Sequence, residues 1–206
     1  MKDQDNTPVF GMIKLGLVLA LYAAVSCTVL AAVNHFTAPQ IARNQEEKVN
    51  ASMRLFFPEE GFSFEAADDF SASATQGIKI ESVILAKKDG RISGGAVQVS
   101  GPTYDSATIL AGIAADGTVR GLQFLSLTDS PGFGLKANDS SYTGKNGKTF
   151  YGQFEGMNAA QPFKAGENFE AISGATITSA GAANLLNEGS RCLLEYFARH
   201  NAEESE

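Results

Sequence analysis

The stretch FEAISGATITSAGAANLL, residues 169–186, gathers small hydroxyl residues directly before an apolar helical pattern. Thr176 stands at or just before the expected start of this last helix, where unpaired backbone N–H groups meet the positive end of the helix dipole. Such an end favours a phosphate group. The neighbours that add hydroxyl groups or leave room for a ligand are Ser173, Gly174, Ala175, Thr178 and Ser179. Because serine and threonine are also common helix caps, these residues alone leave open both a phosphate site and a plain helix start.

The chain has few of the residues that metal sites, catalytic triads or nucleic-acid surfaces require. Its two cysteines, Cys27 and Cys192, are too few for an iron–sulfur cluster or a structural zinc site, which need about four ligands. The two histidines, His35 and His200, offer little for a catalytic triad or a multi-histidine metal site. The net charge is −7 and no basic cluster occurs, which argues against a nucleic-acid surface. We therefore expect no catalytic residue, no metal site and no nucleic-acid partner.

An uncharged run from Leu15 to Val33 is long enough for one transmembrane helix. It exceeds the usual apolar region of a signal peptide, so an anchor is favoured over a cleaved leader. The residues before Cys27 faintly resemble a lipoprotein cleavage site, but the run stays apolar after it. Lys14 precedes the run, and Arg43 and Lys48 follow it, so charge alone does not decide the orientation.

The remaining chain changes its pattern several times. Residues 1–34 form the head and the membrane helix, and residues 35–58 are expected to form a stalk helix that begins near Pro39 and ends before Pro58. Residues 59–77, acidic and rich in serine and alanine, are expected to be a connector. Residues 78–206 are the expected main domain.

Short runs rich in valine, isoleucine and leucine begin that domain. The dipeptides Asp89-Gly90 and Asp116-Gly117 predict two hairpin turns. A loop-rich stretch follows, with short strand candidates around Phe150 to Phe154 and around Phe163, and then the last helix. The expected fold is α+β: one N-terminal transmembrane helix, then antiparallel hairpins packed with helices.

The residues Ser173-Gly174-Ala175-Thr176, followed by Ile177-Thr178-Ser179, resemble a flavinylation motif. The motif belongs to the FMN-binding domains of the RnfG subunit of the Rnf electron-transport complex and of the NqrC subunit of the sodium-pumping NADH:quinone oxidoreductase. In that family the final threonine carries FMN through a phosphoester bond, which implies Thr176 here. The family usually has an aspartate three residues before the serine, where this chain has Glu170.

A second segment, TDSPGFG at residues 128–134, is similar to the family's Glu-Thr-Pro-Gly-Leu-Gly loop. The resemblance implies that this loop forms part of the ring pocket and that Ser173 and Thr178 contact the phosphate or the ribityl chain. Lys164, in the same loop-rich region, is a further candidate for contacting the flavin. The implied loop residues are Asp129, Ser130, Pro131, Gly132, Phe133 and Gly134.

The resemblance also implies a function and partners. Covalent FMN would relay electrons within an Rnf-type complex that links ferredoxin and NAD redox chemistry to ion translocation, beside other membrane, iron–sulfur and flavin subunits. An exported FMN transferase would make the bond, which implies a flavin domain on the outer, periplasmic face of the bacterial inner membrane. Two alternatives stay open: an NqrC-like flavin subunit, and a membrane-anchored binding or assembly protein without cofactor.

Overall fold

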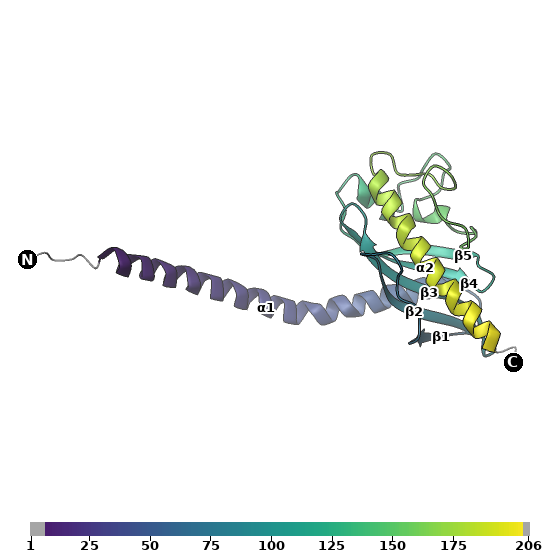
Figure 1. The fold of residues 1–206 in the computed structure, drawn as a ribbon, viewed down its shortest axis with the longest axis horizontal. Helices are drawn as coiled ribbons and strands as arrows, with labels where there is room; N and C mark the ends of the chain where they lie inside the picture. Colours follow the sequence, from purple (N-terminus) through teal and green to yellow (C-terminus); the bar gives the residue numbers. More distant parts are fainter. Residues whose placement is uncertain (1–6, 204–206) are drawn as a thin grey trace, which may run out of the picture. The chain divides into compact units, whose positions relative to one another are not determined.

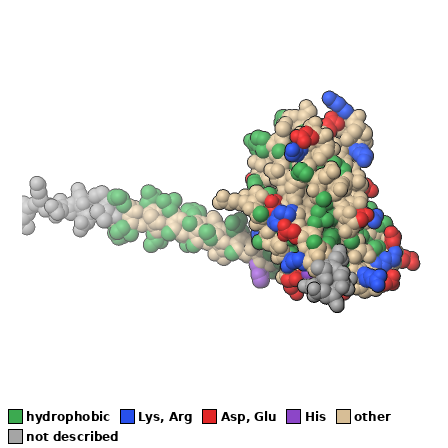
Figure 2. Space-filling model, turned by 45° about the vertical axis from the view of Figure 1, so that its right-hand side comes forward, with side chains coloured by type: hydrophobic (Ala, Val, Ile, Leu, Met, Phe, Trp, Pro, Cys, Tyr) green, Lys and Arg blue, Asp and Glu red, His purple; other side chains and the backbone are tan. Residues whose placement is uncertain are grey.

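The computed structural model describes residues 7–203, so the first six residues of the expected head lie outside the described part. A single long helix, α1, spans Thr7–Phe56. Within it lies an uncharged apolar stretch that is long enough to cross a membrane and has no part buried. Figure 2 shows the hydrophobic side chains along this part of the helix. By length and composition this part of the helix suits a membrane anchor.

The structure has one helix where we predicted a membrane helix and a separate stalk. Pro39 lies inside α1 rather than at the first turn of a new helix. The residues after it are mostly good helix formers, and side-chain pairs one turn apart support the helix on that side. These pairs are Gln40 with Asn44 at 2.9 Å and Arg43 with Glu47 at 3.3 Å. The chain divides into two compact units after Glu47, and the second unit contains the sheet.

The second unit is built on a five-stranded antiparallel sheet in the order β1-β2-β3-β4-β5 (Figure 1). Its strands are β1 (Phe62–Ala67), β2 (Lys79–Lys88), β3 (Arg91–Pro102), β4 (Ser106–Ala114) and β5 (Val119–Leu127). Asp89 and Gly90 both have positive φ, 53° and 80°, as a tight two-residue hairpin turn requires. Asp116 accepts a hydrogen bond from the Thr118 amide at 2.8 Å in the other turn. Both predicted hairpins are confirmed, whereas β1 lies in the segment that we expected to be a connector.

Helix α2 (Thr176–Glu203) crosses one face of this sheet, mainly over β3 and β4 (Figure 1). Its buried side includes Leu185, Leu186 and Leu193, which pack with Val97 and Val99 of β3 in the main core. Glycines bring helix and strand close together. A Cβ atom added at Gly101 of β3 would lie 2.8 Å from Leu185 Cδ2. The predicted last helix is therefore confirmed, and it covers the main core on this face of the sheet.

The opposite face of the sheet packs against the last two turns of α1. Met53, Phe56 and Phe57 form a second core with Ala86, Ala96, Leu110 and Leu125. The alternation of side chains along β3 and β4 explains the two cores, because neighbouring residues of a strand point to opposite faces. The sheet is thus covered by helical residues on both sides.

The segment between β5 and α2 contains only short helical turns, η1 (Gly134–Asn138) and η2 (Tyr151–Gln153). The strand predictions around Phe150–Phe154 and Phe163 are wrong. These aromatic residues do not alternate along a strand; they pack edge to face or tilted in one cluster with Phe169, for example Phe150 with Phe154 at 5.6 Å between ring centroids. The cluster anchors the long loops to the core without a sheet.

Candidate functional site

Thr176 is the first residue of α2, and its side chain is exposed. It makes no side-chain hydrogen bond to any residue that the structure describes, so it does not act as a conventional cap. The turn before it is held by Ser179 instead, whose hydroxyl accepts from the Ile172 amide at 3.0 Å and donates to the Ala175 carbonyl at 2.9 Å. Gly174 has φ of 79°, which a side chain disfavours, and it directs the chain into the helix.

A pocket of about 570 Å³ opens at this end of α2, within the usual size range of small-ligand sites. Thr176 and Thr178 contribute to it from the helix, and the loop after β5 forms the facing wall. Three apolar or aromatic side chains give the pocket an apolar surface and are between 58% and 65% exposed: Phe133 of this loop, Ile177 of α2 and Tyr104 of the β3–β4 connection. The lining residues are Tyr104, Ser130, Pro131, Phe133, Gly134, Gly174, Ala175, Thr176, Ile177 and Thr178.

Most residues of the two predicted motifs therefore meet in one place. Among the predicted site residues, Ser173, Gly132, Asp129 and Lys164 do not line the pocket. Lys164 has its ammonium group 3.5 Å from Glu167, and its backbone amide donates to Asn168. Glu170 accepts a hydrogen bond from the Lys145 amide at 2.9 Å and so holds a neighbouring loop turn.

Sequence reasoning missed Tyr104 and Ile177 as pocket residues. Ile177 follows Thr176 directly and lies on the exposed side of the helix, so its position next to the motif was the available signal. Tyr104 lies in the short connection between β3 and β4, far from both motifs in the sequence. Only the order of the strands brings that connection to the pocket.

Asp129 lies behind the pocket wall and is 2% exposed. Its carboxylate accepts hydrogen bonds from the Thr103 hydroxyl at 2.6 Å and from the Asp105 amide at 2.9 Å, with the Tyr104 amide at 3.4 Å. Burial raises the pKa of Asp129, but the hydrogen bonds from Thr103, from the Thr178 hydroxyl and from the two amides outweigh it, so the pKa is lowered. The carboxylate is therefore ionised at neutral pH.

Two glycines allow the segments around Asp129 to approach closely. A Cβ atom at Gly134 would lie 2.5 Å from Asp129 Cβ and 2.6 Å from Thr178 Oγ1. A Cβ atom at Gly181 of α2 would lie 2.6 Å from Thr103 Cα. Side chains at either position would force α2, the β3–β4 connection and the loop after β5 apart.

Comparisons with known proteins agree with this architecture. Residues 10–54 match the family described as RnfG N-terminal region, and residues 103–190 match the FMN-binding domain family. The second match begins at Thr103 and includes the whole pocket lining.

Relatives cover nearly the whole chain. The G subunit of the ion-translocating oxidoreductase complex of Cereibacter sphaeroides is 30% identical over 98% of this chain and 90% of its own length. The G subunit of the Na(+)-translocating ferredoxin:NAD(+) oxidoreductase complex of Acetobacterium woodii is 31% identical over 84% of this chain and 87% of its own. The G subunit of the proton-translocating ferredoxin:NAD(+) oxidoreductase complex of Clostridium ljungdahlii is 26% identical over 91% of this chain and 92% of its own. A membrane helix, an FMN-binding domain and these relatives together show that the chain belongs to the family of RnfG subunits of Rnf-type ion-translocating oxidoreductase complexes.

Proposed function

We propose that this protein carries FMN joined by a phosphoester bond to Thr176 and relays electrons within an Rnf-type complex linking ferredoxin and NAD redox chemistry to ion translocation. The observation that carries the proposal is the position of Thr176. It is the exposed first residue of α2, its hydroxyl is not used by the described protein, and it lines the pocket of about 570 Å³.

The residues present fit FMN. The backbone N–H groups of Thr176, Ile177 and Thr178 begin the helix, where no preceding turn supplies acceptors, so they can bind phosphate oxygens. The exposed apolar side chains of Phe133 and Tyr104 suit a flat aromatic ring. The absence of a Cβ atom at Gly134 lets the loop after β5 lie close to Asp129 and Thr178 beside the pocket.

The chain supplies binding and orientation, and bound FMN supplies redox chemistry by exchanging electrons singly or in pairs. The start of α2 would hold the phosphate group, and the loop after β5 would border the ring. No general base lies among the pocket-lining residues, so Thr176 is a poor nucleophile without help. A separate FMN transferase is therefore proposed to form the ester by moving FMN from an activated donor to the Thr176 hydroxyl, with release of the rest of the donor. The chain then gains the mass of one FMN less one water.

The family resemblance implies an FMN transferase that acts outside the cytoplasm. We therefore propose that the flavin domain lies on the outer, periplasmic face of the bacterial inner membrane, held by α1. Relatives in this family are named for sodium and for proton translocation. The choice of coupling ion is accordingly proposed to reside in other subunits of the complex, which are the partners of this chain.

An NqrC-like protein is the second candidate for the function, since its FMN-binding domain carries the same motif. The match of residues 10–54 to the RnfG N-terminal region favours the Rnf assignment. A cofactor-free binding protein is the third candidate, and it predicts that Thr176 serves only the fold.

The test is the intact mass of the detergent-purified full-length protein after coexpression with the FMN transferase, with a peptide map of residues around Thr176. We expect a gain of one FMN less one water on that peptide. Thr176→Val keeps the shape of the side chain and should remove the gain while leaving thermal unfolding close to that of the wild type. Protein expressed without the transferase is the control. An unmodified wild-type chain beside an active transferase would contradict the proposal and favour the cofactor-free candidate.

A further inference from the structure

Three segments that are far apart in the sequence meet at one buried carboxylate. Asp129, at the start of the loop after β5, accepts the Thr103 hydroxyl and the Asp105 amide from the β3–β4 connection. It also accepts the hydroxyl of Thr178, in the first turn of α2. The pocket is lined by parts of these same three segments.

Asp129 itself does not face the pocket. It is buried, it is absent from the lining, and its oxygens are taken by protein donors. A hydrogen bond from a hydroxyl or amide to a charged carboxylate is stronger than a neutral one. Removal of the charge would leave buried donors without good acceptors, at a cost larger than the loss of an exposed bond.

The close contacts at Gly134 and Gly181 add a second observation that does not depend on charge. Both glycines permit backbone or side-chain atoms to approach to distances that a methyl group would prevent. The interface between α2 and the two loops is therefore tight on both sides of Asp129. Small shifts of the carboxylate are expected to move the helix end relative to the pocket wall.

From this geometry we propose that Asp129 is the positioning residue of the flavin site, holding the β3–β4 connection, the loop after β5 and the start of α2 in the arrangement that the attached FMN requires. The inference rests on the proposed function at Thr176. It differs from the role implied by the family resemblance, because Asp129 acts through Thr103 and Thr178 rather than by touching the cofactor.

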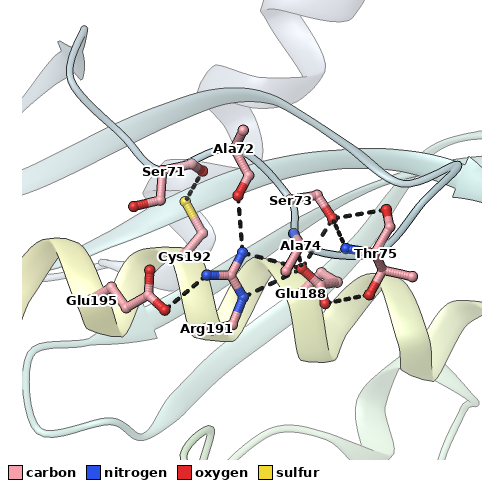
Figure 3. A network of polar contacts seen from close by, with 9 residues as sticks. All are labelled: Ser71, Ala72, Ser73, Ala74, Thr75, Glu188, Arg191, Cys192 and Glu195. Carbon is pink, nitrogen blue, oxygen red and sulfur yellow. Dashed lines mark hydrogen bonds and ion pairs between the residues drawn. The ribbon is translucent and has the colours of Figure 1, made fainter.

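The chain contains a matched control for a purely structural carboxylate. Glu188, also on α2, accepts hydrogen bonds from Ser73 at 3.0 Å, from the Ala74 amide at 3.1 Å and from Thr75 at 2.6 Å (Figure 3). It lies about three turns beyond Thr176, roughly 18 Å along the helix axis at 1.5 Å per residue. Glu188 thus resembles Asp129 in accepting two hydroxyl groups and a backbone amide, although it also pairs with Arg191 at 3.2 Å, and it lies far from the pocket.

The experiment compares full-length wild type, Asp129→Asn, Glu188→Gln, Thr178→Val and Thr178→Ser, each coexpressed with the FMN transferase. The readouts are the fraction of chains with FMN, the fluorescence anisotropy and visible circular dichroism of the attached flavin, and the unfolding temperature. A parallel set made without the transferase is examined by hydrogen exchange of residues 173–180.

We expect Asp129→Asn to lower the attached fraction or the visible dichroism per flavin. It should also speed exchange at the start of α2, by about tenfold if one charge-assisted bond is lost. Thr178→Val should act in the same direction as Asp129→Asn, and the double variant of the two, made in addition, should show little more than Asp129→Asn alone. Thr178→Ser should retain the wild-type signals. Glu188→Gln should lower the unfolding temperature with unchanged flavin signals.

Flavin signals and exchange in Asp129→Asn that equal those of the wild type would overturn the positioning role. The positioning role would also be overturned if Glu188→Gln reduced the flavin signals as much as Asp129→Asn does at an equal loss of stability. A wild-type chain without FMN would overturn the proposed function as well. The mass of the wild type therefore separates failure of the attachment from failure of the positioning role.

Discussion

The ring of Phe56 is the most informative place to test how the sheet is supported. Phe56 is 3% exposed, and its ring lies in a socket on the sheet, directly over the backbone of Gly112 and Gly121. A methyl group at either glycine would overlap the ring. The neighbouring Leu55 is 70% exposed and serves as the matched control.

The expected cost of Phe56→Ala follows from burial and from the shape of the socket. A buried phenylalanine removes on the order of 150 Å² from water, which at about 25 cal/mol/Å² is about 4 kcal/mol. This value lies within the roughly 3–5 kcal/mol observed for such truncations. Because the socket floor is backbone, no side chain there can move in to fill the cavity. At roughly 2–4 °C per kcal/mol, the unfolding temperature should fall by about 8–16 °C.

The assay is thermal unfolding of the detergent-purified full-length protein, followed by near-ultraviolet circular dichroism. The chain has five tyrosines and no tryptophan, and all but Tyr22 lie in the second unit, so this signal reports mainly side-chain packing in that unit rather than unwinding of the long helix. Leu55→Ala should change the unfolding temperature little. A loss of unfolding free energy below about 1 kcal/mol for Phe56→Ala, or an equal loss for Leu55→Ala, would refute the packing of Phe56 against the two glycines.

A double-mutant cycle adds a test of sign. Gly121→Ala alone should destabilise the protein by about 1–3 kcal/mol, because the added methyl meets the ring. In the Phe56→Ala background the same change should cost much less or stabilise, since the methyl enters the cavity. Additive effects of the two changes would mean that Phe56 and Gly121 do not share one space.

Three further predictions concern α2. Burial raises the pKa of Glu188, but the hydrogen bonds that it accepts from Thr75, Ser73, the Ala74 amide and Arg191 lower this pKa on balance. The stabilisation by Glu188 should therefore be present above about pH 4.3, the pKa of an unperturbed glutamate, and should disappear as the pH falls through the lowered pKa of the folded state. Glu188→Gln should flatten this acid limb in unfolding curves taken between acid and neutral pH, and parallel curves for both proteins would contradict it. Ser190 is 1% exposed, and its hydroxyl has no hydrogen-bond partner among the described residues. Ser190→Ala should therefore raise the free energy of unfolding by about 0.5–1 kcal/mol in a denaturant titration, and a lower free energy of unfolding would contradict this. Gly181→Ala should lower both stability, by about 1–3 kcal/mol, and the FMN-loaded fraction measured by intact mass, whereas the exposed neighbour Ala180→Ser should leave both unchanged.

Local patterns in the sequence predicted the features that depend on neighbouring residues. Asp89-Gly90 specifies its turn because both residues tolerate positive φ, and Ser-Gly-Ala-Thr indicates a helix start because small and hydroxyl residues suit that position. The apolar run in α1 indicates a membrane helix from length and composition alone. These predictions needed no knowledge of distant contacts.

Features that depend on distant contacts escaped prediction. Tyr104 joins the pocket only because β3, β4 and β5 pair in order, and Asp129 finds Thr103 across the same meander. Phe150 and Phe154 have the composition of a strand, but packing within the aromatic cluster decides their conformation instead. The segment at Ser71–Thr75 has no regular pattern, and side chains of α2 hold it in place (Figure 3).

The order of elements along the chain has a consequence for biosynthesis. Each strand pairs with its neighbour in sequence, so the sheet can form from nearby contacts while the chain is still being completed. The pocket cannot, because Thr176, the proposed attachment residue, belongs to the last helix and the opposite wall belongs to the loop after β5. A chain truncated before residue 176 would contain the sequence of every strand but would lack the proposed attachment residue and the helix that covers the main core. Attachment of FMN at Thr176, as proposed, would therefore be confined to chains synthesised through the last helix.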